Sequence, residues 1–518
     1  MTNNTEPFAI ELRDISKRFG AVQANKDISL QVPAGTVHGI IGENGAGKST
    51  LMSIIYGFYE ADTGFIEVGG KRVDIRSSQD AIDAGIGMVH QHFMLVENFS
   101  VLENVVLGAE GGALLKGGLA AARVELQRLA KEYSLDIDVD AIVEDLPVGL
   151  QQRVEILKAL YRGARILILD EPTGVLTPQE ADHLFRILKS LKEQGVTVLL
   201  ITHKLREIMA STDNVSVMRQ GEMVAHRETA QTNPEELAEL MVGKKVRLKV
   251  NKDDAKSGNV FLSAKNLTQF DNQGVKRLKE VSLELRAGEI LGIAGVSGNG
   301  QSELLDVLSG IMPMDEGEIQ FAGQTITAKA PKDAAQMRDL KMAHVPEDRH
   351  KMGLVTGFEA YEAAVLGYHN SSSYNGKILM DRKAMLDECH VRMADWDVRP
   401  PNPHLKTANF SGGNQQKIVI AREVEQNPDV LLIGQPTRGV DIGAIENIHE
   451  QIVKLRDSGK AILLVSVELD EIMALSDRII VMFDGAVVGE LDAKDADERT
   501  LGLMMANAHD KEQEGASA

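Results

Sequence analysis

Two stretches of the chain share the same order of apolar and polar positions. Residues 28–32 and 281–285 alternate between apolar and polar side chains, which predicts strands with one face toward a core. Each is followed by a continuous apolar run, at residues 38–42 and 290–295, that leads into a glycine-rich loop. The pattern therefore predicts a β-rich opening and then a buried strand in each half of the chain.

The middle of each half has a helical pattern, at residues 120–134 and 382–396. Short apolar runs such as residues 167–169 and 198–201 then alternate with helical stretches. Alternation of this kind is typical of a mostly parallel sheet covered by helices. We therefore expect an α/β fold in two similar domains.

Sequence motifs confirm that the chain contains an internal repeat. GENGAGKS at residues 42–49 corresponds to GVSGNGQS at residues 295–302, an offset of 253 residues. Later matches have an offset of 264 residues: LPVGLQQR with FSGGNQQK, LILDEPTG with LLIGQPTR, and the EIM that begins at Glu207 with the EIM that begins at Glu471. The second copy is therefore longer between its glycine loop and its later motifs.

The repeat suggests the domain boundaries. We expect a first domain at residues 7–248 and a second at residues 260–508. Residues 249–259, KVNKDDAKSGN, are polar and have no apolar period, which is typical of a linker. Residues 509–518 are polar and are expected to be disordered.

Composition narrows the functional classes. The net charge of −20 disfavours broad binding to nucleic acid, and a single cysteine, Cys389, favours a reducing compartment and excludes a disulfide or zinc scaffold. The first residues have no basic region followed by an apolar run, so no export signal is expected. The longest apolar stretches are shorter than the ~20 residues that cross a bilayer. Work at a membrane would therefore need a partner.

The first glycine loop has the spacing of a phosphate-binding loop between a strand and a helix. Glycines let backbone N–H groups surround phosphate oxygens, Lys48 would reach the outer phosphates, and Ser49 would bind Mg²⁺. A chance glycine turn is the alternative. The candidate nucleotide-binding residues are Gly42, Glu43, Asn44, Gly45, Ala46, Gly47, Lys48, Ser49 and Thr50.

Two adjacent carboxylates follow the apolar run at residues 166–169. Asp170 would help to hold Mg²⁺, and Glu171 would act as the catalytic residue that activates the attacking water. His203 follows the next apolar run and could hydrogen-bond a γ-phosphate. The alternative is that these residues only end their strands.

These motifs together resemble the nucleotide-binding subunits of ATP-binding cassette (ABC) transporters over nearly the whole chain. The resemblance implies two tandem P-loop NTPase domains, each with a mostly parallel sheet core, an antiparallel β subdomain and a helical subdomain. It also implies that Phe19 stacks on adenine, that Gln91 senses Mg²⁺ and faces the permease, and that His203 is a catalytic switch residue. Phe19 could equally be a packing residue.

The copies differ in complementary ways. The family signature is Leu-Ser-Gly-Gly-Gln; the first copy has LPVGL, whereas the second retains Ser411, Gly412, Gly413 and Asn414 as candidate nucleotide contacts. Pro147 has no N–H and Val148 is branched, so we expect the first signature to bind phosphate poorly. The second copy instead lacks the phosphate-handling residues: Gln301, Gly434, Gln435, Glu347 and Val467 stand for Lys48, Asp170, Glu171, Gln91 and His203.

In the family, two cassettes pack head to tail around ATP. The resemblance therefore implies one complete site, with Ser49, Gln91 and Asp170 holding Mg²⁺ and residues 411–414 closing over the phosphate. Asp441 resembles a loop aspartate that crosses to the opposite site, and its counterpart in the first copy is Thr177.

The residue sequences of several motifs resemble those of importers of simple sugars and nucleosides, and they resemble the nucleoside branch most. The resemblance implies an ATPase on the cytoplasmic face of the membrane, with separate permease subunits, an extracytoplasmic solute-binding protein and no nucleic acid. The alternative is a soluble tandem-cassette factor acting on ribosomes or DNA, but such proteins usually keep both carboxylate sets. A regulatory nucleotide binder would fit only if Glu171 were dispensable.

Overall fold

The computed structural model describes residues 8–20, 22–90, 93–108, 115–174, 176, 178–245, 250, 252–296, 298–375, 379–440 and 442–505, with the backbone alone at residues 115–118 and 178. The chain divides into two units at residues 246 and 247. Gln91, Thr177, Asp441 and the predicted tail at residues 509–518 lie outside the described residues. No helix in the described ranges is long and apolar enough to cross a membrane.

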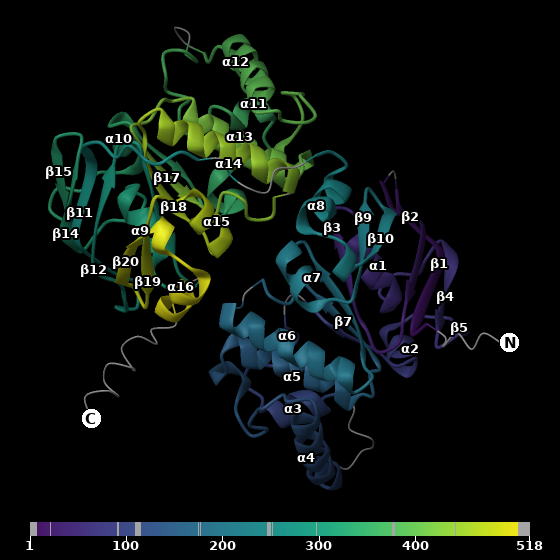
Figure 1. Ribbon diagram of the computed structural model, residues 1–518. Coiled ribbons are helices and arrows are strands. Elements are labelled where there is room, and N and C mark those ends of the chain that lie inside the picture. Colours follow the sequence, from purple (N-terminus) through teal and green to yellow (C-terminus); the bar gives the residue numbers. More distant parts are fainter. Residues whose placement is uncertain are drawn as a thin grey trace, which may run out of the picture. The chain divides into compact units, whose positions relative to one another are not determined.

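The first unit contains two sheets (Figure 1). The small antiparallel sheet has the order β2-β1-β4-β5, and the larger sheet has the order β10-β9-β3-β8-β7-β6. In the larger sheet all neighbours pair in parallel except β9 and β10. The strands are β1 (Ile10–Phe19), β2 (Val22–Val32), β3 (Val37–Gly42), β4 (Thr63–Val68), β5 (Lys71–Val73), β6 (Ile86–Val89), β7 (Ile166–Asp170), β8 (Thr197–Thr202), β9 (Asn214–Arg219) and β10 (Glu222–Glu228).

Helices cover the larger sheet, and the helices from the middle of this unit's sequence form a separate layer. Every residue of β3 and β8 is buried, as expected for parallel strands covered on both faces. Helices α3, α4 and α5 contact one another through an apolar cluster. The helices are α1 (Lys48–Ile55), α2 (Ser78–Asp83), α3 (Val101–Val106), α4 (Leu115–Glu132), α5 (Val148–Tyr161), α6 (Pro178–Glu193), α7 (Leu205–Ser211) and α8 (Pro234–Val242).

The second unit repeats both sheets. Its antiparallel sheet has the order β12-β11-β14-β15, and its larger sheet has the order β16-β17-β18-β13-β19-β20. Each strand has a counterpart at the same place in the first unit. The strands are β11 (Val260–Phe270), β12 (Lys276–Arg286), β13 (Glu289–Ala294), β14 (Glu316–Phe321), β15 (Gln324–Thr327), β16 (Met342–Val345), β17 (Val430–Gly434), β18 (Ala461–Val465), β19 (Arg478–Phe483) and β20 (Ala486–Asp492).

The helical layer of the second unit is built around α13, which contacts α11, α12 and α14 (Figure 1). The predicted fold class is therefore confirmed: each unit has a mostly parallel sheet, an antiparallel sheet and a helical layer. The helices are α9 (Gln301–Leu308), α10 (Ala334–Asp339), α11 (Ala360–Ala363), α12 (Arg382–Asp395), α13 (Gly412–Val424), α14 (Ile442–Asp457), α15 (Leu469–Leu475) and α16 (Glu498–Met505).

An ion pair at equivalent positions anchors a helix to the central strands in both units, but only the pair in the second unit is buried. In the first, Lys192 Nζ lies 2.6 Å from Asp213, whose other oxygen accepts the N–H of Val37 at the start of β3. In the second, the guanidinium of Arg456 is 1% exposed and lies 2.9 Å from Asp477, which accepts the N–H of Ile290 in β13.

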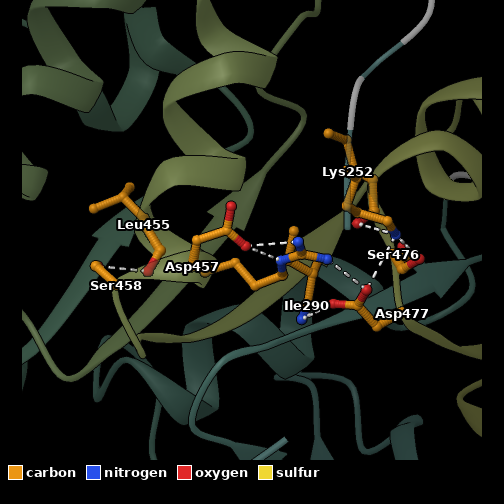
Figure 2. A network of polar contacts seen from close by, with 9 residues as sticks. Lys252, Ile290, Leu455, Asp457, Ser458, Ser476 and Asp477 are labelled. Carbon is orange, nitrogen blue, oxygen red and sulfur yellow. Dashed lines mark hydrogen bonds and ion pairs between the residues drawn. The ribbon is translucent and has the colours of Figure 1, made fainter. Parts of the chain in front are cut away.

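The predicted linker takes part in this second network. Lys252 Nζ lies 3.1 Å from the Asp477 carboxylate and also donates to the backbone oxygens of Leu475 and Ser476 at the end of α15 (Figure 2). Those carbonyls are the ones that a helix leaves unpaired at its C-terminus, where a cation is favourable. Lys252 is therefore held by the second unit rather than free between the two.

We expect Arg456→Met to destabilise the second unit by about 3 kcal/mol, because it leaves a mostly buried carboxylate short of its main partner. Lys192→Met is the matched control, and it should cost only about 1 kcal/mol because that lysine is 38% exposed. Scanning calorimetry of the full chain measures both. Equal losses would show that burial does not set the strength of these pairs.

Candidate functional site

The loop from β3 to α1 has the backbone that phosphate binding requires. Gly45 and Gly47 have φ values of 81° and 99°, in the left-handed region that favours glycine. A Cβ at Gly45 would meet no atom within 4 Å, so this part of the loop is open. The nine predicted residues run from Gly42, the last residue of β3, through the loop to the first turn of α1. The N–H groups at the start of the helix favour an anion there.

Lys48 is buried, and its ammonium group turns back over this loop. Nζ donates to the backbone oxygens of Gly42, at 2.6 Å, and Glu43, at 3.1 Å. The next residue, Ser49, is exposed at the helix start. The loop therefore presents a cation, a hydroxyl group and helix N–H groups from one short segment.

The parallel sheet brings the other catalytic candidates to the same edge. β8 pairs with both β3 and β7, with Ile41 opposite Thr202 and Asp170 opposite Ile201. The residues that follow these strands therefore leave the sheet side by side. His203 Nδ1 lies 2.9 Å from Oε1 of Glu171.

Glu171 has an uncommon backbone conformation. Its φ is 47°, and its N–H donates to the backbone oxygen of Ile201 at 2.8 Å. A side-chain-bearing residue in the left-handed region costs roughly 1 kcal/mol or more, so surrounding contacts must maintain it. The turn points the carboxylate of Glu171 toward His203 instead of continuing the strand.

The two adjacent carboxylates have different electrostatic surroundings. Burial, and then the charge of Glu171, raises the pKa of Asp170 to about 6, although Lys48 opposes the shift. The hydrogen bond from His203 is the main reason that the pKa of Glu171 is lowered. Near neutral pH, Glu171 is therefore the more fully ionised of the two carboxyl groups.

The aromatic candidate Phe19 is the last residue of β1 and is 42% exposed. Its ring meets the edge of Tyr59 at a centroid distance of 5.1 Å. The second unit has an equivalent that our sequence analysis missed: Phe270 is the last residue of β11 and is 41% exposed. The offset between them is 251 residues, not the 253 of the glycine loops, so a fixed offset does not reveal it.

The second unit keeps the loop backbone without its charged groups. Gly298 and Gly300 have φ values of 90° and 96°, and Gln301 begins α9 where Lys48 begins α1. Gln301 Nε2 donates to the backbone oxygen of Val296 at 3.1 Å. Gln435 keeps the left-handed conformation of Glu171, with φ of 49°, but its side-chain oxygen accepts the N–H of Val467 at 3.3 Å.

Glu347 occupies the space that an acidic residue at position 434 would need. A Cβ added at Gly434 would lie 2.5 Å from Cγ of Glu347. The Glu347 carboxylate also accepts a hydrogen bond from Ser302, and burial raises its pKa. The loss of the aspartate and the presence of glutamate at position 347 are thus linked by packing.

The two signature segments differ as the sequence predicts. Ser411 caps α13 by accepting the N–H of Asn414. Gly412 has no room for a side chain, because a Cβ would lie 2.5 Å from the backbone oxygen of Gly439 and 2.7 Å from Arg349 Nη2. In the first unit Pro147 precedes α5 without a side-chain cap among the described residues, and Val148 stands at the position equivalent to Gly412.

The described residues contain no cluster of three or more His, Cys, Asp or Glu side chains that could hold a metal ion by themselves. Ser49 does, however, begin the helix after a loop shaped for phosphate, and Asp170 is close enough to feel the charge of Lys48 in that loop. Mg²⁺ bound with a nucleotide takes most of its ligands from phosphate and water. The residues therefore fit a Mg²⁺–nucleotide, and do not fit a metal bound without one.

The chain is similar to known proteins over most of its length. The family model described as ABC transporter matches residues 25–174 and 278–438. The guanosine import ATP-binding protein NupO of Bacillus subtilis is 44% identical, covering 98% of both chains, and the nucleoside import ATP-binding protein NupA of Lactococcus lactis is 43% identical, covering 98% of this chain and 99% of its own. A solved nucleotide-free ATP-binding cassette from an ABC transporter is 26% identical with a TM-score of 0.40, and covers 46% of this chain and 100% of its own.

The fold and the site define a protein with two P-loop nucleotide-binding domains, of which the first has a lysine, a glutamate and a histidine at the ends of its central strands. The chain belongs to the ABC transporter family, and the resemblance predicted from its motifs is confirmed.

Proposed function

We propose that this chain is the ATP-hydrolysing subunit of a membrane importer for nucleosides or related simple sugars. The observation that carries the proposal is the contact between Glu171 and His203 at the same sheet edge as Lys48. The names of the relatives support the solute class. They include guanosine and nucleoside import ATP-binding proteins, and also the glucose import ATP-binding protein TsgD13 of Haloferax volcanii at 42% identity. None of these names favours a factor acting on ribosomes or DNA.

The catalytic site is composite. The first cassette supplies Lys48, Glu171 and His203, and the second supplies the signature segment at residues 411–414. Support comes from the complementary losses: the second cassette has an uncharged Gln301 and Gln435 but a capped signature helix, whereas the first has an uncapped one. A copy that was merely decaying would be expected to lose its signature as well, and the retention of residues 411–414 argues against that alternative.

Each residue of the first cassette has a separate task. Lys48 exchanges its two backbone acceptors for phosphate oxygens, and the loop N–H groups hold the remaining charge. Glu171 accepts a proton from the attacking water, while His203 orients the carboxylate and can donate to the γ-phosphate. Phe19 provides an exposed surface for the adenine ring. Mg²⁺, held by Ser49, Gln91 and Asp170, would neutralise charge on the transferred phosphate.

The partners are permease subunits in the membrane, placing this chain on the cytoplasmic face, with a solute-binding protein on the other side. We place one permease contact beside Gln91, as the resemblance implies, and the other beside Glu347. A pocket of about 300 Å³ supports the first contact. It is lined by Tyr56, Phe58, His90, Met94 and Lys158 among others, and His90 immediately precedes Gln91.

The two phosphate loops should respond differently to substitution. Lys48→Ala should reduce ATP turnover by the full chain to background, and Glu171→Gln should lower it at least ~10²-fold while ATP remains bound. Gln301→Ala, at the equivalent position of the second loop, should change turnover less than about twofold, since that residue contributes no charge. Comparable losses at Lys48 and Gln301 would contradict a single hydrolytic site.

The composite site is tested by Ser411→Arg, which places a bulky cation at the cap of α13. We expect turnover to fall at least tenfold, because this helix start closes the phosphate site in the proposal. Pro147→Arg, at the equivalent exposed position of the first unit, is the matched control and should have little effect. Normal hydrolysis by Ser411→Arg in the assembled transporter would exclude the head-to-tail arrangement.

The solute class is tested by uptake. A strain lacking this gene should take up labelled nucleosides more slowly than the parent, and the wild-type gene should restore uptake whereas the Glu171→Gln gene should not. Labelled pentoses measured in parallel distinguish the sugar alternative. Unchanged uptake of both would exclude the proposed importer.

A further inference from the structure

A buried carboxylate lies behind the catalytic turn and has no task in the mechanism above. Glu207 is in α7 and is 5% exposed. Its Oε1 accepts a hydrogen bond from the hydroxyl of Thr173, which is also buried and lies two residues after Glu171. Oε2 is buried and, in the part of the chain that the structure describes, has no hydrogen-bond partner. Thr173 therefore gives Glu207 a polar contact with the segment that follows Glu171, and the hydroxyl of Thr202 also lowers the pKa of Glu207, against the larger effect of burial.

The contact reaches the turn whose geometry places Glu171. In the same turn, the backbone oxygen of Pro172 accepts a hydrogen bond from Gln152 Nε2 in α5 at 2.7 Å. Within it, the N–H of Gly174 donates to the backbone oxygen of Glu171 at 3.3 Å. The two residues that follow Glu171 are thus each contacted by a helix, Pro172 by α5 and Thr173 by α7.

Glu207 also belongs to the segment that carries His203. β8 ends at Thr202, His203 follows, and α7 begins at Leu205. His203 and Glu171 lie 2.9 Å apart. Along the chain, His203 is followed by the helix that carries Glu207, and Glu171 is followed by the turn that carries Thr173. The Thr173–Glu207 hydrogen bond is therefore a second link between the two segments that carry Glu171 and His203.

We infer that Glu207 is a positioning residue for ATP hydrolysis, which acts through the Thr173 hydroxyl to keep Glu171 aligned with His203. The inference rests on the proposed role of Glu171. Positioning of this kind affects rate more than binding, because a displacement of about 1 Å at a catalytic group can cost on the order of 10²-fold in rate.

The second unit shows the same carboxylate in a different arrangement. Glu471 is at the equivalent place in α15 and is also 5% exposed, but it accepts a hydrogen bond from His449 Nε2 in α14 at 2.7 Å. The first unit has Phe185 at the position of His449. In the second unit the equivalent turn carries Gln435, whose side-chain oxygen accepts the N–H of Val467. Glu471 thus has the burial of Glu207 without a general base to position.

To accept the hydrogen bond from the Thr173 hydroxyl, the side chain at position 207 needs an oxygen atom but not a negative charge. Burial raises the pKa of Glu207, although the hydrogen bond from Thr173 opposes the shift. A glutamine can accept the same hydrogen bond through its carbonyl oxygen. This separates two classes of variant: Glu207→Gln and Thr173→Ser keep the contact, whereas Glu207→Leu and Thr173→Val remove it.

The test is steady-state ATP hydrolysis by the purified full chain. Glu207→Leu and Thr173→Val should each lower kcat about tenfold or more with KM for ATP changed less than about twofold, and the double variant should lose no more than the worse single variant. Glu207→Gln and Thr173→Ser should retain at least about half of kcat. Glu471→Leu is the matched control for loss of a buried carboxylate, and should lower the melting temperature without lowering kcat comparably.

Glu171→Gln, assayed beside these variants, separates the possible failures. If it hydrolyses ATP at the wild-type rate, the proposed catalytic site is wrong and the role of Glu207 falls with it. If Glu171→Gln is inactive while Thr173→Val keeps the wild-type kcat, only the role of Glu207 is overturned. That role is also overturned if the kcat losses of the two single variants multiply in the double variant, or if the variants change KM alone. Thr173→Val is nearly isosteric, so it carries the test if Glu207→Leu fails to fold.

Discussion

The site depends on one constraint: the chain must leave β7 through a left-handed turn, so that the carboxylate of Glu171 faces His203 at the end of β8. The parallel sheet alone brings the two strand ends together, but an ordinary strand ending would not aim the side chain. The unfavourable backbone of Glu171 is maintained by contacts from β8, α5 and α7. The turn that places the Glu171 carboxylate is therefore contacted by residues from several other elements.

The second unit shows that this backbone and its chemistry are separable. Gln435 has nearly the same φ as Glu171, and the glycines of the second loop have nearly the same φ values as those of the first. What differs is the side chains: the amide of Gln435 stands where the first unit has the carboxylate of Glu171, and Glu347 fills the space beside Gly434. The fold has kept a phosphate-shaped loop while its charged groups have been replaced, as expected if the second cassette serves mainly as the partner of the first.

Much of the architecture was predictable from the sequence, because its strongest signals are local. Buried runs such as β3 and β8, and the alternation of strands with helices, are repeated at matching places in the two halves. Other features were not predictable. Lys252 reads as part of a polar linker, yet it is held by helix-end carbonyls and Asp477 of the second unit. Phe270 was missed because the spacing between the first strand and the loop differs between the copies.

The sequence by itself determined the tandem repeat, the identity of the phosphate loop and the unequal distribution of charged groups, since these depend on which residues follow one another. Tertiary structure alone decided the contacts between residues that are distant along the chain. It placed His203 against Glu171, seated Glu347 in the space beside Gly434, and brought Glu207 to Thr173. Such contacts depend on the register of neighbouring strands and on the packing of helices over them, and neither is written in local spacing.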